Sequence, residues 1–72
     1  MTGNNLKVIS EMSSADLIRL LKDDGGQEVR VRGSHHQFRH LTKAGTVTVP
    51  HPKKDLSKGL VIAILKQAGL RE

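Results

Sequence analysis

The chain has 72 residues and a formal net charge of +5, from twelve Lys and Arg against seven Asp and Glu. This length fits one small domain and excludes a nucleotide-binding α/β enzyme, because a single βαβ unit already takes about 30 residues. The absence of cysteine excludes a disulfide-stabilised scaffold and a cysteine-based zinc site. The longest apolar run, Leu60 to Leu65, has six residues and is far shorter than the ~20 that span a bilayer.

The positive charge is concentrated between Arg30 and Lys58. This stretch holds seven basic residues and a single acidic one, Asp55, so it carries +6 and the rest of the chain −1. All four histidines also lie within it. A local field of this kind favours a polyanionic ligand, with RNA or DNA as the first candidates. The alternative is a solvated basic face that binds nothing.

A helix is predicted near the start of the chain. Residues 1–12 show no clear period, and we expect them to form a flexible arm or a weakly attached strand. Ser13 and Asp16 have the spacing of a capping box and predict that the helix begins there. Gly25 and Gly26 end it, since glycine adopts the left-handed conformation of a helix C-terminus without penalty. Its apolar stripe consists of Leu17, Ile18, Leu20 and Leu21.

Strands are predicted to follow the helix. Residues 28–32 alternate apolar and charged side chains, as in a half-buried strand, and Gly33 and Ser34 form a turn. In the next strand, 35–40, we expect Phe38 to point inward because it is the only aromatic side chain. The face of Phe38 then carries His36 and His40, and the solvent face carries His35, Gln37 and Arg39.

The remaining elements are a third strand and a second helix. The third strand, 46–49, has its valines inward and is stopped by the rigid turn 50–52. Ser57 caps the helix, with Leu56 and Val61 as a hydrophobic staple. The apolar stripe of the helix consists of Leu60, Val61, Ile64, Leu65 and Ala68. The predicted fold class is α+β in the order α-β-β-β-α: a three-stranded antiparallel sheet with two helices on one face and the other face open.

The segment 33–40 (GSHHQFRH) has the chemistry that phosphodiester cleavage requires. A histidine titrates near neutrality and can exchange a proton without a metal. RNA supplies its own nucleophile, the 2′-hydroxyl, so an enzyme needs only a base, an acid and cations that hold the phosphate. His35 on the solvent face, among Arg and Lys, meets that minimum. The alternative is that these histidines are inert surface residues.

The four histidines are not expected to bind a metal. Adjacent histidines on a strand point to opposite faces, no acidic residue lies nearby in the sequence, and the positive field repels cations. We therefore expect neither a metal nor another cofactor.

Residues 13–70 resemble a HicA-type toxin, the small mRNA interferase of HicA–HicB toxin–antitoxin systems. The residues that carry the resemblance are GSHH at 33–36 followed by TVTVPHPKKDL at 46–56, a combination that is specific in order and spacing. Further matching blocks are LIRLLK at 17–22, DG at 24–25, VR at 29–30 and ILKQAGL at 64–70. The resemblance divides the chain into an N-terminal arm or extension, 1–12, and a HicA-like toxin domain, 13–72.

The resemblance implies a fold, an activity and a partner. The family has the fold of a double-stranded-RNA-binding domain, and its members cleave mRNA without a metal, arrest translation and are neutralised by a HicB antitoxin. The catalytic histidine of the family matches His35, and the glycine that sets its turn matches Gly33. The lack of cysteine fits a reducing cytoplasm.

We expect His35 to act as general base or acid. His51 and His36 are the candidates for a second proton-transfer group. The residues expected to bind RNA are Arg30, Arg32, Arg39, Lys53 and Lys54. Two alternatives stay open: a non-catalytic module that binds double-stranded RNA, and a small domain whose basic patch meets an acidic protein.

The sequence departs from the family at Gly26, where many relatives carry an aromatic residue, commonly Trp. An aromatic side chain buries about 150–250 Å², so its loss should loosen the contact between the first helix and the sheet. Only 36% of the residues are apolar. We therefore expect a thin core and marginal stability, which a partner would raise.

Overall fold

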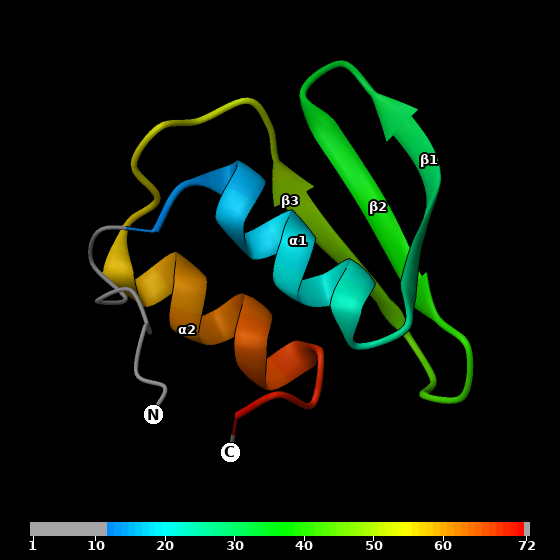
Figure 1. The fold of residues 1–72 in the computed structure, drawn as a ribbon. Coiled ribbons are helices and arrows are strands. Elements are labelled where there is room, and N and C mark those ends of the chain that lie inside the picture. Colours follow the sequence, from blue (N-terminus) through cyan, green and yellow to red (C-terminus); the bar gives the residue numbers. More distant parts are fainter. Residues whose placement is uncertain (1–11, 72) are drawn as a thin grey trace.

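The computed structural model describes residues 12–71, which form a three-stranded sheet and two helices (Figure 1). The elements are α1 (Ser14–Asp23), β1 (Gly26–Arg32), β2 (His35–His40), β3 (Thr46–Pro50) and α2 (Lys58–Gln67). Neighbouring strands are antiparallel, in the order β1-β2-β3. The predicted fold class and element order are confirmed. Of the expected N-terminal arm, residues 1–11 lie outside the described part of the chain, and Met12 is buried in the core.

Local capping signals set where both helices begin. Ser13 Oγ accepts a hydrogen bond from the Asp16 N–H at 3.1 Å, and Asp16 Oδ2 accepts one from the Ser13 N–H at 3.2 Å. The predicted capping box is therefore present. At α2, the Ser57 hydroxyl accepts a hydrogen bond from the Leu60 N–H at 3.2 Å. After α1, Gly25 has a φ of +105°, a conformation that explains why glycine ends this helix.

The core lies between both helices and one face of the sheet. Phe38 of β2 is opposite Val47 of β3 and is 2% exposed, which confirms that Phe38 points inward. The helices contribute Leu17, Leu21, Val61, Ile64 and Leu65. The predicted stripes were wrong at Leu20 and Leu60, which are 39% and 37% exposed because each lies at the solvent edge of its helix.

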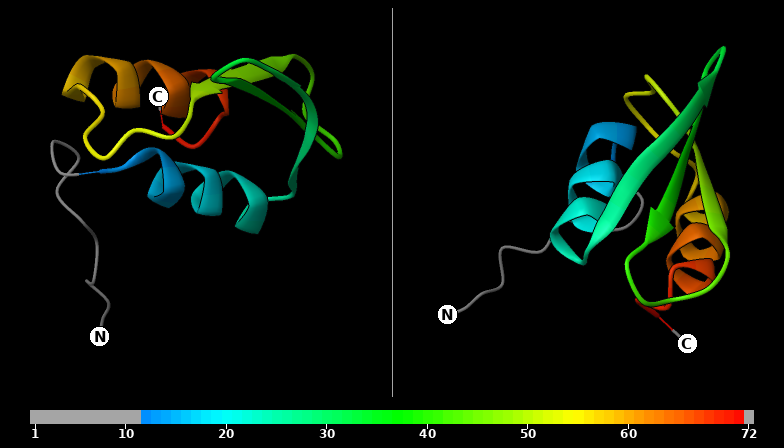
Figure 2. Two further views of the ribbon diagram at one scale, coloured as in Figure 1. Left: turned by 90° about the horizontal axis from the view of Figure 1, so that it is seen from above. Right: turned by 90° about the vertical axis from the view of Figure 1, so that its right-hand side faces the viewer.

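β1 is not the half-buried strand that its alternating pattern predicts. Val29 and Val31 are 52% and 47% exposed. The physical reason is that the β1–β2 hairpin projects beyond both helices, so no layer covers this part of the strand (Figures 1 and 2). The register also shifts between Glu28 and Arg30, where β1 has one more residue than β2.

Gly26, the first residue of β1, packs closely against the end of α1. A Cβ at this position would come within 2.7 Å of the Leu21 carbonyl oxygen, so the backbone leaves no room for a side chain. Gly26, Leu21 and Phe38 line a cavity where α1, the sheet and the end of α2 meet. A looser contact between α1 and the sheet stays a prediction.

Candidate functional site

His35 follows the tight turn that joins β1 to β2. Gly33 has a φ of +59° and Ser34 has no positive φ, the pattern of a type II′ hairpin turn with glycine first. Arg32 and His35 therefore lie directly opposite each other, and Pro50 of β3 flanks His35 on its other side. The His35 side chain is exposed and makes no hydrogen bond to any residue between 12 and 71. Both imidazole nitrogens are thus open to a ligand.

The face of the sheet that carries His35 is open and cationic. Residues opposite each other in antiparallel strands share a face, so the register assigns this surface. Its members, called the open face below, are Gln27, Arg30, Arg32, His35, Gln37, Arg39, Thr46, Thr48 and Pro50. All three arginines are exposed, and within the described residues this face has no carboxylate. Gln37 Nε2 donates to Thr48 Oγ1 at 3.4 Å across the two strands, as a shared face requires.

An extra residue in β1 places two of these arginines. Glu28 lies opposite Phe38 on the helix-covered face, and Arg30 lies opposite Gln37 on the open face. Strict alternation would put residues 28 and 30 on the same face, so the extra residue, Val29, is what turns Arg30 and Arg32 toward His35's side. Sequence reasoning missed this bulge.

His36 and His51 form a separate cluster on the helix-covered face. Their rings meet edge to face, with centroids 4.9 Å apart and an interplanar angle of 87°. His36 Nδ1 lies 3.0 Å from Glu28 Oε1, and His51 Nδ1 lies 2.7 Å from the Ser14 hydroxyl oxygen. The sheet therefore separates these two predicted proton-transfer groups from His35.

Ser14 fixes the loop after β3 against the start of α1. Its side chain is buried, and its hydroxyl accepts a hydrogen bond from the Lys53 N–H at 2.8 Å. The Ser14 N–H in turn donates to the Lys53 carbonyl oxygen at 2.9 Å. Lys53 and Lys54 line an open groove beside the first residues of α1 and are both exposed. Sequence reasoning missed Ser14, because nothing local to it signals a partner 39 residues away.

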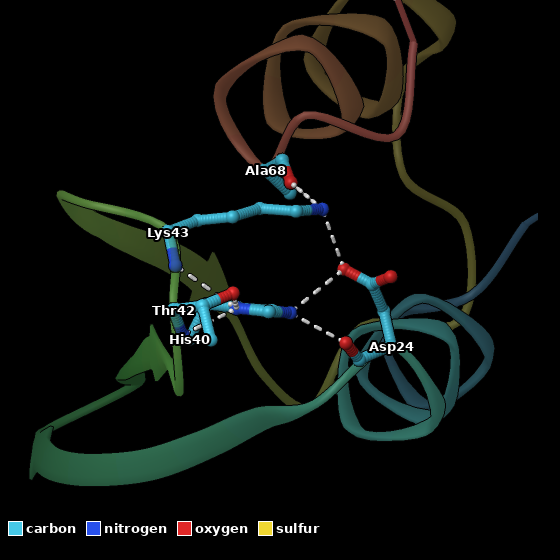
Figure 3. A network of polar contacts seen from close by, with 5 residues as sticks. All are labelled: Asp24, His40, Thr42, Lys43 and Ala68. Atoms are coloured by element: carbon cyan, nitrogen blue, oxygen red, sulfur yellow. Dashed lines mark hydrogen bonds and ion pairs between the residues drawn. The ribbon is translucent and has the colours of Figure 1, made fainter.

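His40 has a structural role at the far end of β2 (Figure 3). Its Nδ1 accepts hydrogen bonds from the backbone N–H groups of Thr42 and Lys43, at 2.9 and 3.1 Å. The proton of the neutral ring is therefore on Nε2, which donates to the Asp24 carbonyl oxygen. The Lys43 ammonium bonds Asp24 Oδ2 at 2.8 Å and the Ala68 carbonyl oxygen at 3.1 Å, which ties the end of α1 to the end of α2. The hydrogen bond from Lys43 lowers the pKa of the Asp24 carboxyl.

The predicted site residues thus divide between two surfaces. The open face holds His35 with Arg30, Arg32 and Arg39. The helix side holds His36, His51, Lys53 and Lys54. Residues 12–71 contain no group of three or more His, Asp or Glu side chains placed to hold a metal ion. Within the same range, neither helix is long and apolar enough to cross a membrane.

The arrangement defines a class of protein: a small basic α+β domain with the fold of a double-stranded-RNA-binding domain. In addition to that fold, it presents a histidine among arginines on its open face. The family model of the HicA toxin of bacterial toxin–antitoxin systems matches residues 14–70. The chain therefore belongs to the HicA toxin family, as the resemblance predicts. A search of curated proteins found no match for it.

Proposed function

We propose that this toxin is a metal-independent endoribonuclease that cleaves mRNA in the cytoplasm, arrests translation and is neutralised by a HicB-type antitoxin. The observation that carries the proposal is the position of His35. It is exposed, and its imidazole makes no hydrogen bond to any described residue. Arg32 lies opposite it on a face where residues 12–71 place no carboxylate. A purely structural histidine, such as His40, has both ring nitrogens bonded.

The proposed reaction needs little from the protein. His35 takes the proton of a ribose 2′-hydroxyl, and the 2′-oxygen attacks the adjacent phosphorus as the bond to the 5′-oxygen breaks. The leaving oxygen is protonated, giving one product with a 2′,3′-cyclic phosphate and one with a 5′-hydroxyl. Arg32 offsets the charge that develops on the phosphate. We assign the second proton transfer to solvent at the exposed site, since His36 and His51 lie on the other face of the sheet.

A cleavage assay with end-labelled RNA tests this function. We expect wild-type protein to cleave in the presence of a chelator and to leave 2′,3′-cyclic phosphate ends. His35→Ala should abolish cleavage and growth arrest without unfolding the domain. His36→Gln, a change at the neighbouring histidine on the other face, is the matched control and should keep cleavage. A requirement for added metal, or full activity in His35→Ala, would contradict the proposal.

A second candidate function is a non-catalytic module that binds RNA, which the fold and the basic charge support equally well. Phosphate contacts alone give salt-dependent affinity without chemistry. The same assay separates the two, because a binding module shifts the RNA in a gel and leaves it intact.

The proposed antitoxin should stabilise the toxin by linkage. A partner that binds only the folded state at a hundred times its Kd adds about 2.7 kcal/mol. We expect the Tm to rise when a cognate HicB-type protein is added, and an unchanged Tm would count against that partner.

A further inference from the structure

The register of the sheet indicates which basic residues can hold RNA together with His35. Three cross-strand rows cover the open face, starting at the β1–β2 turn. They are Arg32–His35–Pro50, Arg30–Gln37–Thr48 and Gln27–Arg39–Thr46. Each row thus carries one arginine, and the first also carries His35. The open face is therefore a cationic track that runs along β2.

We propose that a single strand of RNA lies along this track, a proposal that rests on the ribonuclease function above. The scissile phosphate lies between His35 and Arg32, whose Cβ atoms are about 5 Å apart in such a pair. Flanking phosphates lie on Arg30 and Arg39. Arg39 lies four residue steps after His35, a distance of about 13 Å along β2. The track therefore holds a short run of nucleotides on the sheet.

The polar residues between the arginines favour an unpaired strand over a duplex. Gln27 and Gln37 place amide donors and acceptors in the track, and these groups match the Watson–Crick edges of bases, which only unpaired nucleotides expose. The single aromatic side chain, Phe38, is buried on the other face. Bases on the track then stack on guanidinium planes. Phosphate contacts dominate the affinity, and sequence preference is modest.

The basic loop after β3 lies outside this track. The Lys53 backbone is bonded to Ser14 at the start of α1, and Lys53 and Lys54 line a groove on the helix side. An RNA strand on the open face does not meet this groove. Of the five residues that the sequence predicts as RNA contacts, the track therefore holds Arg30, Arg32 and Arg39, and it leaves out Lys53 and Lys54.

The experiment measures RNA binding at a series of salt concentrations. The parent protein carries His35→Ala so that a labelled single-stranded RNA stays intact. Each phosphate contact adds about 0.7 to the slope of log K against log salt for a single strand. Arg30→Gln and Arg39→Gln should each lower the slope by about that amount. The matched controls, Lys54→Gln and Arg19→Gln, remove exposed charges on the helix side and should leave it unchanged.

Several results would overturn the track. One is a salt slope that falls in Lys54→Gln and not in the arginine variants. Another is that a duplex of the same sequence binds more tightly than the single strand. A third is that the parent protein binds no RNA. Cleavage by the wild type is assayed in parallel. If the wild type cleaves and the arginine variants bind like the parent, the track is wrong and the ribonuclease function stands. If the wild type does not cleave, the function itself fails.

Discussion

Deleting Val29 tests the bulge that places Arg30 on the open face. Val29 is the extra residue between Glu28 and Arg30, so its removal leaves a regular strand. Arg30 then stays opposite Gln37, and the register on both sides is unchanged. We expect the shortened protein to fold and to keep its RNA affinity.

Deleting Val31 instead is a matched control with the opposite outcome for Arg30. It also removes one residue and makes β1 regular, and the turn keeps its two residues. Val29 then moves to the open face, and Arg30 moves to the helix-covered face opposite His36. The two deletions therefore differ mainly in the face on which Arg30 lies.

Their costs in stability should be similar. Val29 and Val31 are 52% and 47% exposed, so about half of each residue's surface is buried in the folded protein. Full burial of a valine contributes about 1.5–3 kcal/mol, so each deletion costs about 1 kcal/mol in the free energy of unfolding. Only the Val31 deletion should lower the salt slope of RNA binding, by about 0.7.

Urea unfolding and RNA binding of the two shortened proteins give the answer together. The reasoning about the bulge is refuted if both deletions reduce the salt slope of RNA binding equally. It is also refuted if the Val29 deletion unfolds the domain and the Val31 deletion does not.

Further predictions concern the turn, the loop and the ends of the helices. Gly33→Ala should lower the free energy of unfolding by about 1–2 kcal/mol, because Gly33 has a φ of +59°. Gly59→Ala, where a Cβ meets open space in α2, should raise it by about 0.4–1 kcal/mol. Urea unfolding that ranks the two variants the other way would contradict this. Ser14→Ala should cost about 1–3 kcal/mol because it removes a buried hydroxyl that accepts a part-buried hydrogen bond from the Lys53 N–H. An unchanged unfolding midpoint would show that water replaces the hydroxyl. Asp24 has a lowered pKa, so its contribution is complete above the ordinary pKa of Asp and is lost as the pH falls through the lowered value. Lys43→Met should therefore make stability fall less steeply below about pH 4, and equal slopes in urea unfolding at several pH values would argue against the ion pair.

The parts of the fold that sequence predicts well are those set by neighbouring residues. The capping box needs only Ser13 and Asp16, three positions apart, and the turn needs only a glycine where φ is positive. Phe38 could be placed inward because the chain offers one aromatic side chain to a small core. The face of His35 follows from that placement, since adjacent residues of a strand alternate.

What sequence could not predict depends on contacts between distant segments. The alternating pattern of residues 28–32 is the same whether or not β1 carries an extra residue, because the bulge is defined only by the pairing with β2. The bond between Ser14 and His51 joins positions 37 residues apart. The exposure of Val29 depends on how far the hairpin projects beyond the helices. Each of these is a tertiary property.

The two faces of the sheet explain how so small a domain can carry both a core and a candidate site. One face packs the apolar side chains and holds His36 and His51 in polar contacts, which fixes their rings. The other face does not contribute to the apolar core, so it can carry the arginines that surround His35. Such a concentration of positive charge destabilises the unbound protein by self-repulsion, and a polyanion or an acidic partner relieves that repulsion. A thin core and a cationic open face are thus consistent with a toxin that is most stable when its antitoxin is bound.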